Sequence, residues 1–152
     1  MMVNLDLKLT CAIARSTHLL GDKWSLLILR DILLHKKSRF KDFMESKEKI
    51  ATNILTNRIK SLIDADLIVL LDKNSTKKSR QYIATQKGIS TLPIILELYM
   101  FSIKDINESV LNDQQIQIKK QIISNSENFI NSKRIDYMAF KEDLLSKVIE
   151  HK

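Results

Sequence analysis

Glycine and proline are scarce in this chain, and that scarcity constrains its fold more than any other feature. The 152 residues include only 2 glycines and 1 proline. Sandwiches and barrels with many strands need turn residues at most of their strand connections, so this composition disfavours them. We therefore expect a mainly helical fold, and the length fits one domain or one domain with an appendage.

The rest of the composition narrows the class of protein. With 44% hydrophobic and 28% charged residues, the chain is typical of a globular protein. A single cysteine supports neither a disulfide framework nor a cysteine-rich zinc site, which fits the reducing cytoplasm. The first residues have no basic flank before an apolar core, and no apolar run approaches the roughly 20 residues of a membrane span. We expect a cytoplasmic protein with no membrane contact.

No pattern of an active site is visible. His18, His35 and His151 do not have metal-ligand spacing, and two isolated glycines cannot form a phosphate-binding loop. We therefore predict no catalytic residues, no metal and no cofactor, and we expect that the protein is not an enzyme.

The net charge of +7 is concentrated in one part of the chain. Residues 1–105 hold 18 basic and 11 acidic side chains, a net charge of +7, whereas residues 106–152 hold seven of each. The window 23–87 alone has 15 basic and 7 acidic side chains, a net charge of +8. A solvated surface is one interpretation, and a surface that neutralises phosphates is the other.

Apolar periodicity predicts the order of elements. A helix over 11–20 ends at Gly21, and a nearly all-apolar helix over 24–34 is expected in the core. Ser38 is a candidate N-cap for a short helix with Phe40, Phe43 and Met44, and an amphipathic helix follows over 52–64. Two β-prone runs, 67–71 and 80–84, predict a hairpin, and a long helix capped by Thr85 reaches Ile103. Two further helices are expected over 112–124 and 132–150.

A short helix, a break and a helix with an exposed Thr/Asn/Lys face form a helix-turn-helix pattern, and the hairpin after it is a wing. In this order and spacing, residues 11 to about 103 resemble the HxlR family of winged helix-turn-helix, MarR-like transcription regulators. The matching pieces are Cys11, the run from Gly21 to Asp31, Arg39-Phe40, Asp42-Phe43, Ile50, Leu55, Arg58-Ile59, Leu62, Leu67-Ile68, Tyr82, Thr85 and Lys87-Gly88.

The chain departs from the family pattern in four places. Ala12 follows the cysteine where the family usually has proline, and Ala51 replaces a serine before the second helix, so that Thr52 is the candidate cap. Asp66 stands where glycine is usual before the hairpin, and the wing has Lys77 and Lys78 in place of proline. Aspartate tolerates the left-handed backbone at modest cost.

The resemblance implies a sequence-specific DNA-binding transcription regulator, with repression as the expected output. It implies a homodimer on double-stranded DNA, with residues 1–105 as the DNA-binding domain including the dimerisation helices. The resemblance does not extend to residues 106–152, which we expect, from their neutral and amphipathic sequence, to be a helical extension that stabilises the dimer. The expected base contacts are Thr52, Asn53, Thr56 and Asn57. The expected DNA backbone and wing contacts are Arg39, Lys49, Arg58, Lys60, Lys77, Lys78 and Arg80, of which Arg58 has an ion pair within the fold as its alternative.

Three further expectations follow from the same comparison. The dimer seam is assigned to Leu92, Ile95, Leu96, Tyr99 and Ile103. Cys11, at a helix N-terminus, is the candidate sensor of electrophiles or oxidants, with an inert small side chain as the alternative. A small-molecule effector can bind between the first helix and the long helix after Gly88. The competing function is a winged-helix protein-interaction module that does not bind DNA, for which a net charge of +8 over 23–87 has no use.

Overall fold

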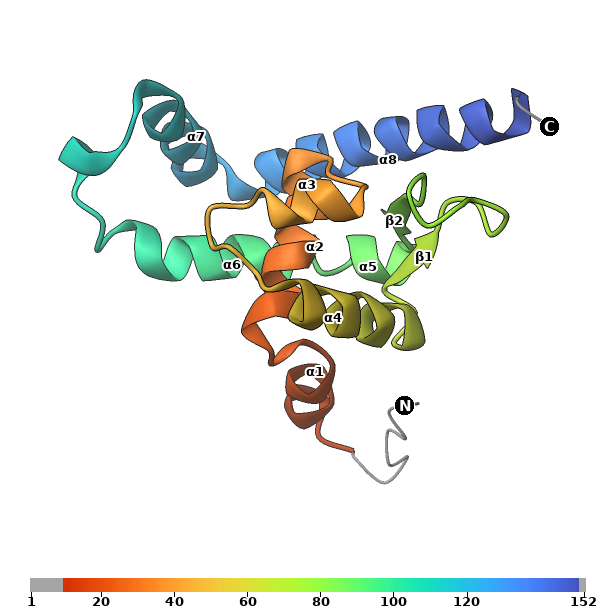
Figure 1. Ribbon diagram of the computed structural model, residues 1–152. Coiled ribbons are helices and arrows are strands. Elements are labelled where there is room, and N and C mark those ends of the chain that lie inside the picture. The colour runs from red at the N-terminus through yellow and green to blue at the C-terminus, as the bar shows by residue number, and fades with distance from the viewer. Residues whose placement is uncertain (1–9, 151–152) are drawn as a thin grey trace.

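The structure is a computed structural model that describes residues 10–150. It is mainly helical with one antiparallel hairpin, as the sequence predicts, and Figure 1 shows the arrangement. The elements are α1 (Ala12–Leu20), α2 (Lys23–His35), α3 (Phe40–Met44), α4 (Thr52–Asp64), β1 (Ile68–Leu70), β2 (Tyr82–Ala84), α5 (Gln86–Ile89), α6 (Leu92–Ile103), the 3-10 helix η1 (Glu108–Val110), α7 (Asp113–Ser124) and α8 (Ser126–Glu150).

Helix α2 is the centre of the fold, as its nearly continuous apolar sequence predicts. It packs against α4, α6, α8 and β2, and its residues Ile28, Leu29, Ile32 and Leu33 are buried. Its first turn is capped by the Asp22 carboxylate, which accepts a hydrogen bond of 2.8 Å from the Ser25 amide. The other elements are therefore positioned relative to α2.

The outer edge of β2 in the β1–β2 hairpin is bonded to two other parts of the chain. Within it, Val69 pairs with Ile83, and on the outer edge of β2 two amides find partners from elsewhere in the chain. The Tyr82 amide donates to the Ser38 carbonyl at 2.7 Å, and the Ala84 amide donates to the Tyr137 hydroxyl at 2.8 Å. The α2–α3 link and α8 thus bond to this edge of the wing and give both amides a partner.

The expected role of Ser38 is wrong. The N-cap of α3 is Arg39, whose amide donates to the Asp42 carboxylate at 3.1 Å, whereas the Ser38 hydroxyl donates to Gln81 at 2.8 Å. Ser38 is buried because both its hydroxyl and its carbonyl bond to the hairpin. A serine before a helical pattern looks the same in sequence whether it caps the helix or joins a strand edge.

The stretch predicted as one helix from Thr85 to Ile103 forms two. The Thr85 hydroxyl accepts from the Gly88 amide at 3.0 Å and caps the short α5, and α6 begins at Leu92 with Pro93 in its first turn. At Gly88, a Cβ would lie 2.0 Å from the Leu67 carbonyl oxygen, so the close approach of α5 to the start of β1 requires glycine.

The C-terminal helices pack on the winged-helix part. Helix α7 ends at Ser124, as predicted, and Asn112 is its N-cap, but α8 begins at Ser126 rather than near 132. Tyr137 belongs to the main core, whereas Ile122 and Phe129 form a second cluster with Leu96 of α6. In Figure 1, α8 extends from beside α7 past the hairpin. Residues 106–150 therefore share their packing with the preceding segment.

Candidate nucleic-acid interface

Helix α4 separates its two faces as the sequence predicts. Leu55, Ile59 and Leu62 are buried against the core, and the outer face carries four exposed residues, namely Thr52, Asn53, Thr56 and Asn57. The Thr56 hydroxyl donates to the Thr52 carbonyl at 2.9 Å. Among residues 10–150, neither the Asn53 nor the Asn57 side-chain amide has a hydrogen-bond partner, so both can offer a donor and an acceptor outwards.

The expected cap of this helix is wrong. The N-cap position belongs to Ala51, and Thr52 is already the first helical residue, with its hydroxyl 4.0 Å from the Met44 sulfur. An alanine offers no side-chain oxygen, so the first amides of α4 have no side-chain partner from this position. The start of α4 therefore has no side-chain cap.

A polar network on α2 holds the turn between α3 and α4. Asp31 is 3% exposed, and its carboxylate accepts hydrogen bonds from Arg30, at 2.8 Å, and from the Ser46 hydroxyl. Arg30 also reaches Glu48 with a 2.6 Å contact, and Lys37 donates to Ser46 at 2.8 Å. Because Ser46 and Glu48 lie in the turn, the network sets the position of α4 relative to α2.

The same network shifts the pKa of its own members, most clearly that of Glu48. The Arg30 guanidinium beside Glu48 lowers the pKa of that carboxyl to about 2, so the pair stays ionised across the physiological range. Nothing in the sequence reasoning assigned a role to Asp31, Ser46 or Glu48. The one available signal was that Arg30 and Asp31 interrupt a helix that is otherwise apolar on all sides, since buried charges occur almost only in pairs.

Most of the expected cationic side chains lie on the surface. Lys49, in the turn, has a φ of 55°, and it is exposed together with Lys60 on α4 and Lys77 and Lys78 in the wing. Arg39 and Arg80 are half-buried beside the hairpin, and Arg39 forms a β-bridge with Gln81. The cations thus come from the turn, the helix and the wing.

Arg58 behaves differently from these lysines. Its Nε lies 2.9 Å from the Asp22 carboxylate, which is the N-cap of α2. The structure therefore favours the alternative role of Arg58, an ion pair within the fold that joins α4 to the start of α2. The Arg58 guanidinium is already paired with the Asp22 carboxylate, so it is not a free cation for a DNA phosphate.

A known family shares this architecture. The sequence profile of the HxlR-like helix-turn-helix family matches residues 19–110. The chain belongs to the HxlR-like helix-turn-helix family. Its members are transcription regulators and are not enzymes. The matched region contains the network, α4 and the hairpin, and it ends before α7 and α8.

Solved structures agree with the HxlR-like assignment. PA1607, named as a putative transcription factor, is 29% identical with a TM-score of 0.57, and the match covers 64% of this chain and 66% of that one, just under two thirds of its length. A protein from Porphyromonas gingivalis W83, named as a putative transcriptional regulator of the MarR family, is 23% identical with a TM-score of 0.54 and shows the same fold, with 64% of this chain and 94% of that one covered. No curated protein matches the chain.

The HxlR-like pattern explains Asp66. This residue, which stands where the family usually has glycine, has a φ of 59°. The left-handed turn before β1 is therefore kept with aspartate, as expected. The Thr85 hydroxyl donates to the Asp66 carbonyl at 2.6 Å, so the turn is tied to the end of β2.

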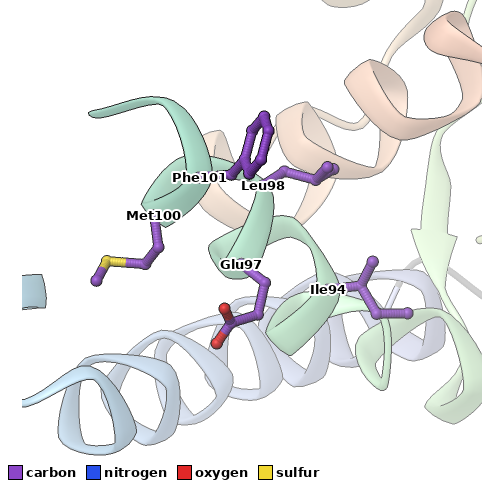
Figure 2. Close-up of a pocket in the computed structure, with 5 residues that line it drawn as sticks. All are labelled: Ile94, Glu97, Leu98, Met100 and Phe101. Atoms are coloured by element: carbon purple, nitrogen blue, oxygen red, sulfur yellow. The ribbon is translucent and has the colours of Figure 1, made fainter. Parts of the chain in front are cut away.

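The residues predicted to form the dimer seam are not available for it on the surface of the single chain. Leu92, Ile95, Leu96 and Ile103 are buried inside the single chain, and Tyr99 is half-buried, because α2, α7 and α8 cover that face of α6. The apolar side chains that α6 leaves exposed are Ile94, Leu98 and Phe101, at 42%, 48% and 77% exposure. Figure 2 shows Leu98 and Phe101 on the same side of the helix, along a shallow hollow.

The remaining expectations concern the cysteine, metals and membranes. Cys11 is exposed at the N-cap of α1, so it is accessible, and its sensing role stays a prediction. Residues 10–150 contain no cluster of three or more His, Cys, Asp or Glu side chains suited to a metal ion. Within the same residues, no helix combines the length and apolarity of a membrane span. His151 lies outside the described residues.

Proposed function

We propose that this chain is a cytoplasmic, sequence-specific DNA-binding transcription regulator, with repression as its output. The observation that carries the proposal is the outer face of α4, where Asn53 and Asn57 are exposed with uncommitted amides beside Thr52 and Thr56. Asparagine can bond bidentately to adenine, and a threonine methyl can contact thymine, in the major groove. The HxlR-like family assignment supports the same role for α4.

Phosphate contacts are assigned to the surrounding cations. Lys49, Lys60, Lys77 and Lys78 are exposed, and Arg39 and Arg80 lie beside the hairpin. In the described residues, no ion pair involves any of these six side chains. Cations without an internal partner can neutralise phosphates and release counterions. Arg58 is excluded from this group because Asp22 occupies it.

A homodimer completes the site. We assign the seam to the exposed face of α6, Ile94, Leu98 and Phe101, since three large apolar side chains on one helix are costly to leave in water. A two-fold dimer would place two α4 helices about 34 Å apart, one turn of DNA. Ile135, Met138 and Leu145 are exposed apolar residues of α8, through which the C-terminal helices can enlarge the seam.

The decisive experiment is selection of bound duplexes from a random library with the full chain, followed by a salt titration of the selected site. If a dimer neutralises roughly six to ten phosphates, affinity falls by about 10³ to 10⁵ between about 50 and 200 mM salt. An enriched motif with that slope supports the proposal. No enriched duplex together with a flat salt profile contradicts it and favours the protein-interaction module.

A further inference from the structure

Two amides of β2 face away from the hairpin and need partners from elsewhere in the molecule. The Thr85 amide faces β1, where it donates to the Leu67 carbonyl at 3.0 Å. Backbone amides alternate in direction along an antiparallel strand, so the Ala84 amide faces away from β1, as does the Tyr82 amide two residues before it. A buried amide is costly to leave without an acceptor, so the outer edge of β2 requires two acceptors.

The two acceptors come from different parts of the chain. The Tyr82 amide, at the end of β2 nearest the wing loop, donates to the Ser38 carbonyl, which lies inside the segment matched by the family. The Ala84 amide, at the other end of β2, donates to the Tyr137 hydroxyl on α8, beyond residue 110, where the family match ends. A tyrosine hydroxyl thus continues an edge that the backbone of the α2–α3 link begins.

The hydrogen bond from Ala84 to Tyr137 is closed to water. Tyr137 is 1% exposed and Ala84 is fully buried, and the ring of Tyr137 lies 6.0 Å from the ring of Phe140. Burial raises the pKa of Tyr137 to about 12, so its hydroxyl stays uncharged at physiological pH. Without this oxygen the Ala84 amide would be buried and unpaired, because no solvent molecule can reach it as a substitute.

Two bonds on one edge fix the direction of the hairpin. Strand residues rise by about 3.4 Å each, so the amides of Tyr82 and Ala84 are about 7 Å apart along β2. A hairpin bonded at one point can turn about that point, whereas a second bond farther along the same edge prevents the turn. Lys77 and Lys78 lie in the loop between β1 and β2, so their position depends on this direction. Figure 1 shows α8 passing the hairpin.

We propose that Tyr137 is a positioning residue for the wing: its hydroxyl fixes the direction of the hairpin and so places Lys77 and Lys78 against DNA phosphates. Helix α8 then contributes to DNA binding directly, in addition to any contact that it makes with a second chain. The first step, which fixes the hairpin, is independent of what the protein binds. The second step, which places the lysines on DNA, rests on the proposed function.

The first step is tested by amide hydrogen exchange, measured by NMR on the full chain without DNA. Tyr137→Phe keeps the ring and removes the hydroxyl, so exchange at Ala84 should become about tenfold faster or more relative to Tyr82 in the same molecule. Taking the ratio cancels a general loss of stability. Tyr99→Phe is the matched control and should leave the ratio unchanged, because its half-buried hydroxyl forms no hydrogen bond within residues 10–150. An unchanged ratio in Tyr137→Phe, or the same change in both variants, overturns the proposal.

The second step is tested by salt titrations of a selected duplex. Tyr137→Phe should weaken binding by about fivefold or more and reduce the salt dependence as much as Lys77→Ala and Lys78→Ala combined. Adding Tyr137→Phe to those two substitutions should cost nothing more, because the wing contacts are already lost.

A merely structural tyrosine would lower stability and leave the salt dependence unchanged. An unchanged salt dependence, or a loss that adds fully to that of the two lysines, overturns the second step. If the unmodified chain binds no duplex, the proposed function fails and the second step fails with it, whereas the exchange ratio still decides the first.

Discussion

Helices α4 and α6 have similar lengths and similar buried faces, but the exposed face of α4 is polar and that of α6 is apolar. Each buries leucine and isoleucine against the core, at positions such as Leu55 on α4 and Leu96 on α6. Outwards, α4 presents Thr, Asn and Lys, whereas α6 presents Ile94, Leu98 and Phe101. The chemistry of the exposed face therefore separates the two functions that we assign: a polar face reads DNA and an apolar face meets a second chain.

The largest expected effect comes from placing a charge on the exposed face of α6. Phe101→Glu should convert the proposed dimer to a monomer and weaken DNA binding by about 10² to 10⁴, because the second half-site is no longer bound intramolecularly. Light scattering and a binding titration measure the two effects. Val110→Glu, at an equally exposed apolar residue in η1, is the matched control and should change neither. If the Phe101→Glu variant is still a dimer, the dimer seam does not lie on α6.

Truncating a buried leucine on either helix should lower the free energy of unfolding to a similar extent. Leu55→Ala and Leu96→Ala should each lower the free energy of unfolding by about 2 to 5 kcal/mol, because both side chains are fully or almost fully buried. Urea unfolding at one fixed protein concentration measures the loss, and Glu97→Ala on the exposed side of α6 should stay within about 0.5 kcal/mol. A small cost for Leu96→Ala alone would mean that α7 and α8 do not cover α6 as the structure shows.

These two helices also show how far sequence reasoning reaches. The bounds of α4 and its buried residues follow from periodicity, because an amphipathic helix displays in its own sequence which face meets the core. On α6 nearly all residues are apolar, with Glu97 and Ser102 as the exceptions, so the apolar pattern by itself does not say which face α7 and α8 cover. The seam was consequently assigned to residues that the chain buries itself, Leu92, Ile95, Leu96 and Ile103.

The sequence also did not predict the long-range polar contacts. The bond from Ala84 to Tyr137 joins residues 53 positions apart, and the contact from Arg30 to Glu48 joins residues 18 apart. No local pattern marks such pairs, whereas caps such as Thr85 and Asn112 are visible because their partners lie three residues away. For the candidate site, sequence therefore located the exposed face of α4 and missed the network that positions it.

Removing a side-chain amide from the exposed face of α4 should change which DNA sequence the protein prefers. Asn57→Ala should cost about 1 to 3 kcal/mol against one base pair of the selected site and little on duplexes altered there. Binding titrations on a set of single-base variants measure this, and Lys77→Ala in the wing is the control, with a uniform loss on all duplexes. If Asn57→Ala also weakens every duplex equally, the amide contacts the DNA backbone instead of a base.

The smallest effect separates two cations on the same helix. Lys60 is exposed, so Lys60→Gln should reduce the steepness of the salt dependence by about one phosphate, whereas Arg58→Gln should leave it unchanged because Asp22 holds the guanidinium. Both partners of that pair are about one-third exposed, so Arg58→Gln should cost no more than about 1 kcal/mol of stability. A double-mutant cycle with Asp22→Asn, which can still cap α2, measures the coupling. A reduced salt slope in Arg58→Gln with no coupling to Asp22 would return Arg58 to the DNA-binding surface.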